Sequence, residues 1–463
     1  MKALSLAAAL AAFLAAPLAR GQDARPPADP STSSSGTTPD AHAAAVPCGA
    51  TDDVDIGPRA ALLVEKRREK CHHIAPYQPT WLEKRILGYE KAEQPSFAEQ
   101  NLFGLYPRVQ TIDHRSEWGG GIRLWRPNIK GSHFDVHGGA FASLGGFQFY
   151  DVQAGVIPHP AKGFPLFASR ADQAFEQANV TRTAEPSYMI YGAFTRRYSP
   201  QYDFFGVGPD SQEENHSDYL QRDSLYEGVA GYRLWHRLTF ATRLGYYHVV
   251  LGAGKDEELP NVEDVFDPVT IPGFEERPPD FLRYGASATF DSRIFAKNPH
   301  AGAVLVADWQ RYDQRGGGQA SFNRYAADVR AFLRLGDAQR VLALRAYFSK
   351  DDPSAAGGRV PFYLLQFLGG SHTLRAFDSQ RFRGEKLALL QAEYRWEASP
   401  AIELALFVDS GTVAARTDDD LGSFKTDGGI GLRFKSHQAL LMRLDLAWGA
   451  EGTKFLLRFS PSF

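Results

Sequence analysis

The chain has 463 residues, a formal net charge of −3, 43 glycines and two cysteines, and it is rich in aromatic side chains (32 Phe, 19 Tyr and 7 Trp). A nearly neutral chain lacks the basic surface that nucleic-acid binding requires, so we expect no nucleic-acid partner.

Residues 1–21 are typical of a cleaved secretory signal peptide. A basic start at Lys2 precedes an apolar run from Leu4 to Ala16, and small residues near Gly21 suit a signal peptidase. The run is too short to span a membrane, and no later stretch approaches the roughly 18 apolar residues of a transmembrane helix. We therefore expect an exported protein that is either soluble in the periplasm or embedded as a β-barrel.

Residues 22–57 are rich in Pro, Ser, Thr and Ala, and we expect a disordered tether there because so few large apolar side chains cannot offset the ordering entropy. We expect residues 58–114 to form a short, partly helical N-terminal segment, with amphipathic helices over 58–73 and 80–93. These helices pack on a barrel rim in one interpretation, and one of them plugs the lumen in the other.

The two cysteines, Cys48 and Cys71, both precede the predicted barrel. In an oxidising periplasm they could form a disulfide. A zinc site using Cys71, His72 and His73 is a weaker alternative, because adjacent histidines do not easily bind one ion together. We expect no metal ion and no cofactor.

From residue 115 to residue 463, apolar and polar residues alternate with a period of two, which predicts strands with lipid on one side and a wet lumen on the other. The chain ends in this pattern, and we expect Phe459 and Phe463, on the lipid face, to form the signal of the last barrel strand. An edge strand of a soluble sandwich is the alternative. The recurrence of the pattern favours an all-β fold, a transmembrane antiparallel β-barrel of about 16 strands.

The longest connections between these strands are candidates for the outside face of the membrane, and residues 199–217 break the expected alternation of long and short connections. Inward positions carry both signs of charge, which favours cross-strand ion pairs. The predicted strands cover residues 116–126, 132–143, 147–157, 187–198, 218–234, 237–251, 281–293, 301–312, 321–335, 340–349, 361–367, 386–398, 401–410, 425–435, 440–449 and 453–463. The candidate outside connections are 158–186, 252–280, 350–360, 368–385 and 411–424.

One connection narrows the family. It reads LGGSHTLRAFDSQRFRGE from Leu368 to Glu385, and it resembles the sixth extracellular loop of the BamA/TamA superfamily of outer-membrane assembly and secretion barrels, the bacterial surface antigen family. The family's Val-Arg-Gly-Phe/Tyr tetrad corresponds to Leu374, Arg375, Ala376 and Phe377. FVDSG at 407–411, GGIGLRF at 428–434 and MRLDLAWG at 442–449 follow in the family's order, and FFGVGPDS at 204–211 and YGASATFDSR at 284–293 precede it.

The resemblance implies that this loop folds into the lumen and that Arg375 meets Asp409. Alternation in strand 401–410 also points Phe407 and Asp409 inward, where a carboxylate suits a bidentate arginine. Gly369, Gly370 and Gly384 would let the backbone turn sharply. Ala376 departs from the family's glycine, which would bend the tip differently or loosen the lock if that position needs a positive φ.

Members of the family carry periplasmic POTRA domains before the barrel, and residues 22–110 show no convincing strand pairs for one. We therefore expect a member without POTRA domains. Two functions remain: a barrel that inserts or exports a polypeptide or moves a lipid, and a passive pore or structural surface barrel. A barrel-embedded hydrolase is a third, weaker alternative, and we expect no enzymatic activity because neither a G-x-S-x-G elbow nor a defensible Ser/His/Asp grouping is present.

The glycine-rich start of the first predicted strand, Gly119-Gly120-Gly121, should pair poorly and favours an openable seam between the first and last strands. The expected location is the outer membrane. The expected partners are outer-membrane lipids, the assembly machinery during biogenesis and an unidentified polypeptide or lipid cargo.

Overall fold

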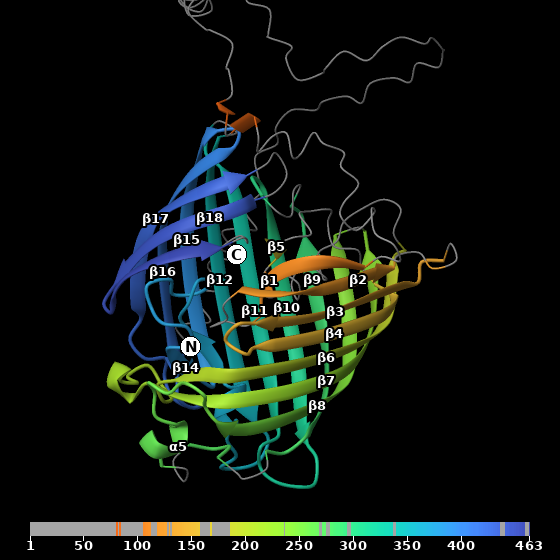
Figure 1. Ribbon diagram of the computed structural model, residues 1–463, viewed down its shortest axis with the longest axis vertical. Coiled ribbons are helices and arrows are strands. Elements are labelled where there is room, and N and C mark those ends of the chain that lie inside the picture. Colours follow the sequence, from red (N-terminus) through yellow and green to blue (C-terminus); the bar gives the residue numbers. More distant parts are fainter. Residues whose placement is uncertain are drawn as a thin grey trace, which may run out of the picture. The chain divides into compact units, whose positions relative to one another are not determined.

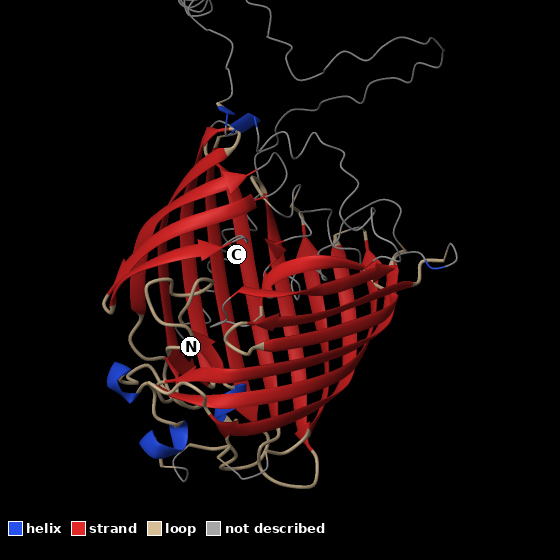
Figure 2. Cartoon of the chain, viewed as in Figure 1, coloured by secondary structure: helices blue, strands red, loops and turns tan. Residues whose placement is uncertain are grey.

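The computed structural model describes residues 80–81, 83–84, 105–112, 118–126, 129, 132–157, 167–168, 186–235, 237–267, 271–274, 278–293, 298–336, 339–435, 440–458 and 463. Within the unit Pro79–Phe463, one sheet of seventeen strands and one separate hairpin account for most of the described chain (Figure 2). The strands are β1 Leu105–Thr111, β2 Trp118–Arg126, β3 Asp135–Ser143, β4 Gln148–Val156, β5 Phe167–Ala168, β6 Tyr188–Phe204, β7 Ser217–Leu234, β8 Leu238–Ala253, β9 Phe281–Asp291, β10 Gly302–Gln314, β11 Phe322–Arg334, β12 Arg340–Pro353, β13 Gln366–Leu368, β14 Phe382–Gly384, β15 Lys386–Ser399, β16 Ile402–Ala414, β17 Lys425–Lys435, β18 Leu440–Gly449 and β19 Gly452–Arg458. The short helices are η3 Glu213–Asn215, α5 Val262–Val265 and η4 Phe362–Leu364.

The strands pair with their neighbours along the chain. Each strand pairs in antiparallel fashion with the next one in the series β1, β2, β3, β4, β6, β7, β8, β9, β10, β11, β12, β15, β16, β17, β18 and β19. Figure 1 shows the sheet curling, so that β6, β7 and β8 cross in front of β10, β11 and β12. Among the described residues no register joins β1 to β19, and only the two-residue β5 pairs with β1 in parallel. The sheet is therefore curled but not closed.

The expected number of strands is confirmed, but two of the predicted elements were wrong. Without β5 and the β13–β14 hairpin, sixteen antiparallel strands form the sheet. The sheet begins at Leu105, so the predicted boundary at residue 115 and the helical assignment up to 114 are corrected. Residues 361–367 do not form a barrel strand, because they hold η4 and part of the hairpin. Their apolar side chains gave a strand-like pattern because they are buried in a core.

The predicted alternation of faces is clear in β16. Leu404, Leu406 and Val408 are 41%, 57% and 52% exposed, as lipid-facing side chains of a barrel would be in the absence of lipid. The alternate residues Glu403, Phe407 and Asp409 are buried at 2%, 3% and 0% exposure. The inward surface of the sheet is therefore a packed, partly charged interior.

The ends of the strands correct the assignment of residues 158–186 to the outside face. Tyr188, at the start of β6, lies opposite Tyr232 near the tight turn at Trp235. The connection from β4 to β6 thus leaves from the same end of the sheet as that short turn, the end expected to be periplasmic. Because β6 extends to Phe204 and β7 begins at Ser217, residues 205–216 belong to the opposite end, and the break in alternation disappears.

The C-terminal residue is also placed differently from the prediction. Strand β19 ends at Arg458, and its Phe455 faces outward with 68% exposure, as expected. Phe463, however, is only 6% exposed and packs with Phe332, Val341 and Ala343, which face inward from β11 and β12. Phe463 therefore does not lie on the lipid face that the period-two pattern predicted for it. Phe459 lies outside the described residues, so its part in a terminal signal stays a prediction.

Little of the N-terminal prediction can be compared with the structure, because the signal peptide, the tether, Cys48, Cys71, His72, His73 and the helix at 58–73 lie outside the described residues. In the predicted helix 80–93, residues 81, 83 and 84 are helical, and Thr80 and Glu83 exchange backbone-to-side-chain hydrogen bonds as a capping box. None of the described helices is long and apolar enough to cross a membrane.

Candidate functional site: a loop inside the sheet

The candidate site is built on the connection between β12 and β15, residues 354–385, here called the lumen loop. The β13–β14 hairpin closes its base, with Gln366 opposite Gly384 and Leu368 opposite Phe382. Beyond the hairpin, Gly369 and Gly370 have φ values of +111° and +91°, which only glycine adopts easily. Gly384 has no positive φ and instead lies so close to the Ala414 backbone that a side chain would not fit. The three glycines thus turn the loop back toward the sheet.

At the tip of the loop, the fully buried Arg375 meets the inward face of β15, β16 and β18. Its guanidinium donates from Nε to Asp409 Oδ2 at 2.7 Å and from Nη2 to Asp409 Oδ1 at 3.1 Å. Nη1 lies 3.2 Å from Glu393 Oε2 and 3.4 Å from Asp445 Oδ2. The guanidinium carbon also stacks 3.5 Å from the ring centre of Phe407. The structure thus brings together Arg375, Asp409 and Phe407, the residues that the sequence selected.

Ala376 is accommodated without strain. It is not among the described residues with a positive φ, so the reason for expecting a looser lock does not apply. Its backbone N–H donates to Asp427 Oδ2 at 3.0 Å, and its side chain packs with Phe407 and Ala447. A β-carbon added at Gly449 would lie only 3.0 Å from that of Ala376. A glycine on β18 therefore makes the room that an alanine in the loop occupies.

The neighbouring Phe377 anchors the tip in an apolar pocket. It packs with Leu368, Leu374 and Phe382 of the lumen loop and with inward side chains of β15 and β16 (Leu387, Leu389 and Val413). Its ring lies edge-on to Phe382, with centres 5.4 Å apart. The tip thus combines a buried charge network with a buried apolar contact, and each fixes the position of the other.

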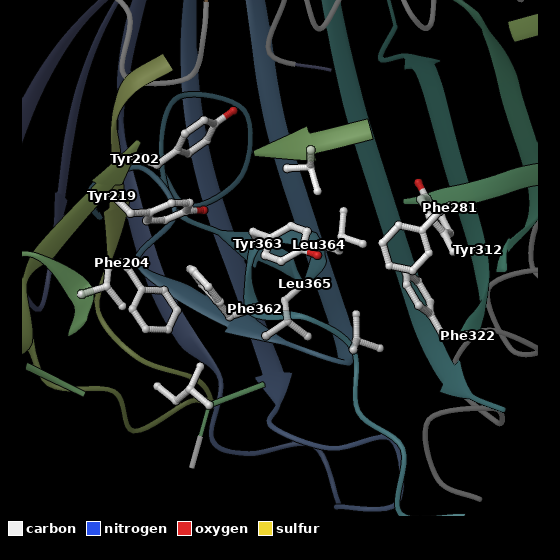
Figure 3. Packing of buried hydrophobic residues seen from close by; sticks show 14 of the residues in the cluster. Tyr202, Phe204, Tyr219, Phe281, Tyr312, Phe322, Phe362, Tyr363, Leu364 and Leu365 are labelled. Carbon is white, nitrogen blue, oxygen red and sulfur yellow. The ribbon is translucent and has the colours of Figure 1, made fainter. Parts of the chain in front are cut away.

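The base of the lumen loop packs on the opposite wall. Figure 3 shows Phe362 and Tyr363 between Phe204 and Tyr219 on one side and Phe281, Tyr312 and Phe322 on the other. The aromatic cluster takes its inward side chains from β6, β7, β8, β9, β10 and β11. Together, base and tip extend the loop from β6–β11 to β15–β18, across the interior of the curled sheet.

Two arginines that follow the tip connect the loop to residues 204–211, the upstream motif FFGVGPDS. Arg381 donates to Ser211 Oγ at 2.9 Å and to the Ser211 carbonyl at 2.8 Å, and it lies over the Phe205 ring. Arg383 donates to the carbonyls of Asp203 and Phe362, and its own carbonyl accepts a hydrogen bond from the Gly208 N–H. The segments that the family resemblance singled out therefore contact one another directly.

The loop also contacts the last strand and its turn. Lys454 of β19 forms an ion pair with Asp378, and Arg458 donates from Nε to Ser371 Oγ at 2.9 Å. Glu451, in the turn before β19, lies 2.9 Å from Arg381 Nε. Burial raises the pKa of this Glu451 carboxyl, and the adjacent Arg381 opposes that shift. One end of the sheet is thus attached to the loop at three points.

Sequence reasoning missed several members of the charge network. Glu393, Asp445 and Arg433 were predicted only to be inward charges, and Arg443 and Asp427 were not singled out. Arg433 Nη2 donates to Glu393 Oε2 at 2.7 Å, and Arg443 donates to the Ser371 carbonyl at 2.6 Å. The available signal was that charged residues occupy inward positions on the strands that follow the loop, β15, β17 and β18.

A family comparison agrees with this geometry. Residues 174–460 match the model of the Omp85 superfamily domain. The chain belongs to the Omp85 superfamily. That match contains the lumen loop, its partner strands and the aromatic cluster. No curated protein matches the chain by sequence.

Three solved structures are similar to this chain. A crystal structure of BamA from Haemophilus ducreyi lacking POTRA domains 1–3 is 12% identical, with a TM-score of 0.51 over 84% of this chain and 80% of that one. CdiB from Acinetobacter baumannii is 14% identical, with a TM-score of 0.43 over 77% of this chain and 59% of that one. CdiB from Escherichia coli is 11% identical, with a TM-score of 0.45 over 77% and 62% of the two chains. At these identities the BamA likeness supports the fold alone.

Proposed function

We propose that this Omp85-type barrel resides in the outer membrane and inserts or exports a polypeptide, or moves a lipid, by opening the seam between β1 and β19. The observation that carries the proposal is the asymmetry of the two end strands. The lumen loop contacts β19 and its turn at three points, whereas β1 pairs with β2 and with only two residues of β5. The lumen loop therefore holds β19, the C-terminal edge strand, in place, and we expect β1, the N-terminal edge strand, to be the one that moves when the seam opens.

The position of the seam differs from the sequence-based expectation. Gly119, Gly120 and Gly121 lie in β2, which is fully registered with β1 and β3, so they do not form the edge. The edge strand is β1, and its outward Leu105 and Pro107 are exposed. Pro107 has no N–H to donate to a neighbour, which weakens any ladder formed on that strand.

The alternative function, a passive pore, is disfavoured by what occupies the lumen. The aromatic cluster and the charge network are both buried, and they join the lumen loop to opposite walls. Conduction would require this loop to leave the interior, which would leave buried charges without partners. A structural surface barrel without transport remains the other outcome of the experiment below.

The experiment locks the seam with a disulfide. In a variant with Cys48 and Cys71 replaced by serine, one cysteine is placed at Leu105 or Pro107 of β1 and the other at Phe455 or Leu457 of β19. The matched control ties two strands already in register, with Ile122→Cys and Ala140→Cys, which lie directly opposite in β2 and β3.

We compare the outer-membrane proteins and lipids of a deletion strain that carries each variant, before and after reduction. The proposal expects the seam-locked variants to resemble the deletion until the disulfide is reduced, and the control to behave as wild type. Full complementation by a quantitatively crosslinked seam would overturn it. Conductance of the purified wild type in a planar bilayer would then distinguish a pore from a structural barrel.

A further inference from the structure

An outward-facing cationic cluster lies on β6 and β7 near the loop end of the sheet. Arg196 and Arg222 both occupy exposed, even-numbered positions, whereas their odd-numbered neighbours Arg197 and Asp223 pair with each other inside. In the register, Tyr198 lies directly opposite Arg222, and Arg196 lies directly opposite Ser224. The two guanidinium groups are thus diagonal neighbours on one face, close enough to repel each other.

Neither arginine has a counter-charge in the described part of the chain: the side chains of Arg196 and Arg222 form no hydrogen bond, ion pair or ring contact there, although both backbones pair within the sheet. A third cation adds to them, because the Lys255 ammonium lies 5.6 Å from the centre of the Tyr198 ring. The backbone N–H of Lys255 donates to the Pro200 carbonyl at 3.2 Å and holds the lysine there. Asp280, which immediately precedes β9, is already engaged by Tyr246 and His248 of β8.

Aromatic residues indicate how deep in the membrane the cationic cluster lies. Outward tyrosines occur at the start of β6, at Tyr188, and ten residues further along it, at Tyr198. The strand between them rises about 33 Å, or about 23 Å along the membrane normal at a 45° tilt. That spacing matches the apolar band of an outer-membrane barrel, roughly 25 Å tall with aromatic girdles at both edges. Phe194 and Tyr226 form an outward ring pair just inside, with centres 4.8 Å apart. Arg196 and Arg222 therefore lie at the boundary with the lipid headgroups.

From this arrangement we infer that Arg196, Arg222 and Lys255 form a binding site for a phosphorylated lipid headgroup of the leaflet at the loop end of the barrel. Guanidinium groups bind phosphate oxygens in bidentate geometry, and a phosphate between the two arginines replaces their mutual repulsion with charge-assisted hydrogen bonds. The adjacent tyrosine rings would contact the upper part of the acyl chains. The inference requires the barrel to be in a membrane and does not depend on seam opening.

The test uses the full mature chain in detergent, titrated with lipopolysaccharide as a phosphorylated lipid of the outer leaflet. Binding is followed by the midpoint temperature of the folded-to-unfolded shift on semi-native gels. The test variant is Arg196→Gln/Arg222→Gln. The matched control is Arg334→Gln/Arg340→Gln, which removes two exposed arginines at the turn between β11 and β12, the opposite end of the sheet.

Lipopolysaccharide should raise the midpoint of the wild type and of the control, and the test variant should need about tenfold more lipid for the same rise. Added salt should weaken the response of the wild type, and Arg196→Lys/Arg222→Lys should retain most of it, which separates loss of charge from misfolding. Equal titrations for wild type and test variant would overturn the inference. So would equal protection by inorganic phosphate or by dephosphorylated lipid A. The seam-locking result can fail without affecting any of these outcomes.

Discussion

The Arg375 guanidinium and the Asp409 carboxylate form a bidentate pair in which neither side chain is exposed. A loop residue and a strand residue 34 positions apart in sequence are thus joined inside the barrel. Burying two charges costs desolvation energy, which is recovered only while both partners are present. The pair therefore serves to specify where the loop lies more than to add net stability.

Removing one partner of this pair should be strongly destabilising. Arg375→Ala removes the cation that pairs with Asp409 and leaves that carboxylate between the Gln391 amide and the Asp427 carboxyl. We therefore expect a loss of about 3–5 kcal/mol in the free energy of unfolding. Asp409→Ala should cost less, because Arg375 keeps Glu393 and Asp445. The double variant should cost less than the sum of the singles. Heat-modifiability on semi-native gels measures all three, and unchanged mobility with unchanged yield would contradict the lock.

The contact between Ala376 and Gly449 predicts a reciprocal pair of variants. Gly449→Ala should lower stability by about 1–3 kcal/mol, because its new β-carbon would lie 3.0 Å from that of Ala376 and 3.2 Å from that of Asp427. Ala376→Gly, which restores the family's residue, should recover part of this loss in the double variant. A double-mutant cycle on the gel-shift midpoint measures the coupling. Additive effects would show that the alanine and the glycine do not compensate for each other.

Substitution by alanine should affect stability very differently at two phenylalanines near the C-terminus, Phe463 and Phe455. Phe463→Ala removes a buried ring that packs with Phe332 and lies 5.8 Å from the Arg395 guanidinium carbon, so the detergent-solubilised barrel should lose about 3 kcal/mol. Phe455→Ala removes a ring with 68% exposure and should change stability little. Thermal gel shifts of the two proteins make the comparison. Equal losses would place Phe463 on the lipid face after all.

The sequence predicted the positions of the strands and the faces of their side chains well. It predicted the strand ends and the connections between strands poorly, for physical reasons. Alternation in strands such as β16 follows directly from a lipid-exposed and a packed face, so Leu406 and Asp409 could be assigned from the pattern. Residues 361–367 were also predicted as a strand, because the apolar side chains from Phe362 to Leu365 are buried in the aromatic cluster and not on a barrel wall. Strand β1 was missed because Pro107 and Arg108 interrupt its alternation.

The candidate site shows the same division. The family motif predicted that Arg375 contacts Asp409, and the alternation of strand 401–410 predicted that the Asp409 side chain faces inward. The position of Glu393, Asp445 and Gly449 around the tip depends on the register of strands far apart in sequence, which no local pattern carries. The inward position of Phe463 depends on its packing with Phe332, Val341 and Ala343 of distant strands, which the alternating pattern does not reveal.

The Glu385 carboxylate, at the base of the lumen loop, predicts a pH dependence. It accepts hydrogen bonds from the backbone N–H groups of Val360, at 3.2 Å, and Thr417, at 2.8 Å, and so joins two connections at the loop end. Burial raises the pKa of Glu385 above its usual range, and these two hydrogen bonds only partly oppose the shift.

A raised folded-state pKa means that the folded protein binds this proton more tightly than the unfolded chain does. The group's contribution to stability is therefore largest below the unfolded-state pKa and falls as the pH rises through the folded-state pKa. Glu385→Gln should remove that part of the pH dependence, so its gel-shift midpoint should change less than that of the wild type between acidic and neutral pH. Glu257→Gln, at an exposed position in the connection between β8 and β9, is the control and should follow the wild type. A wild-type-like pH profile for Glu385→Gln would show that protonation of this carboxylate is not coupled to folding.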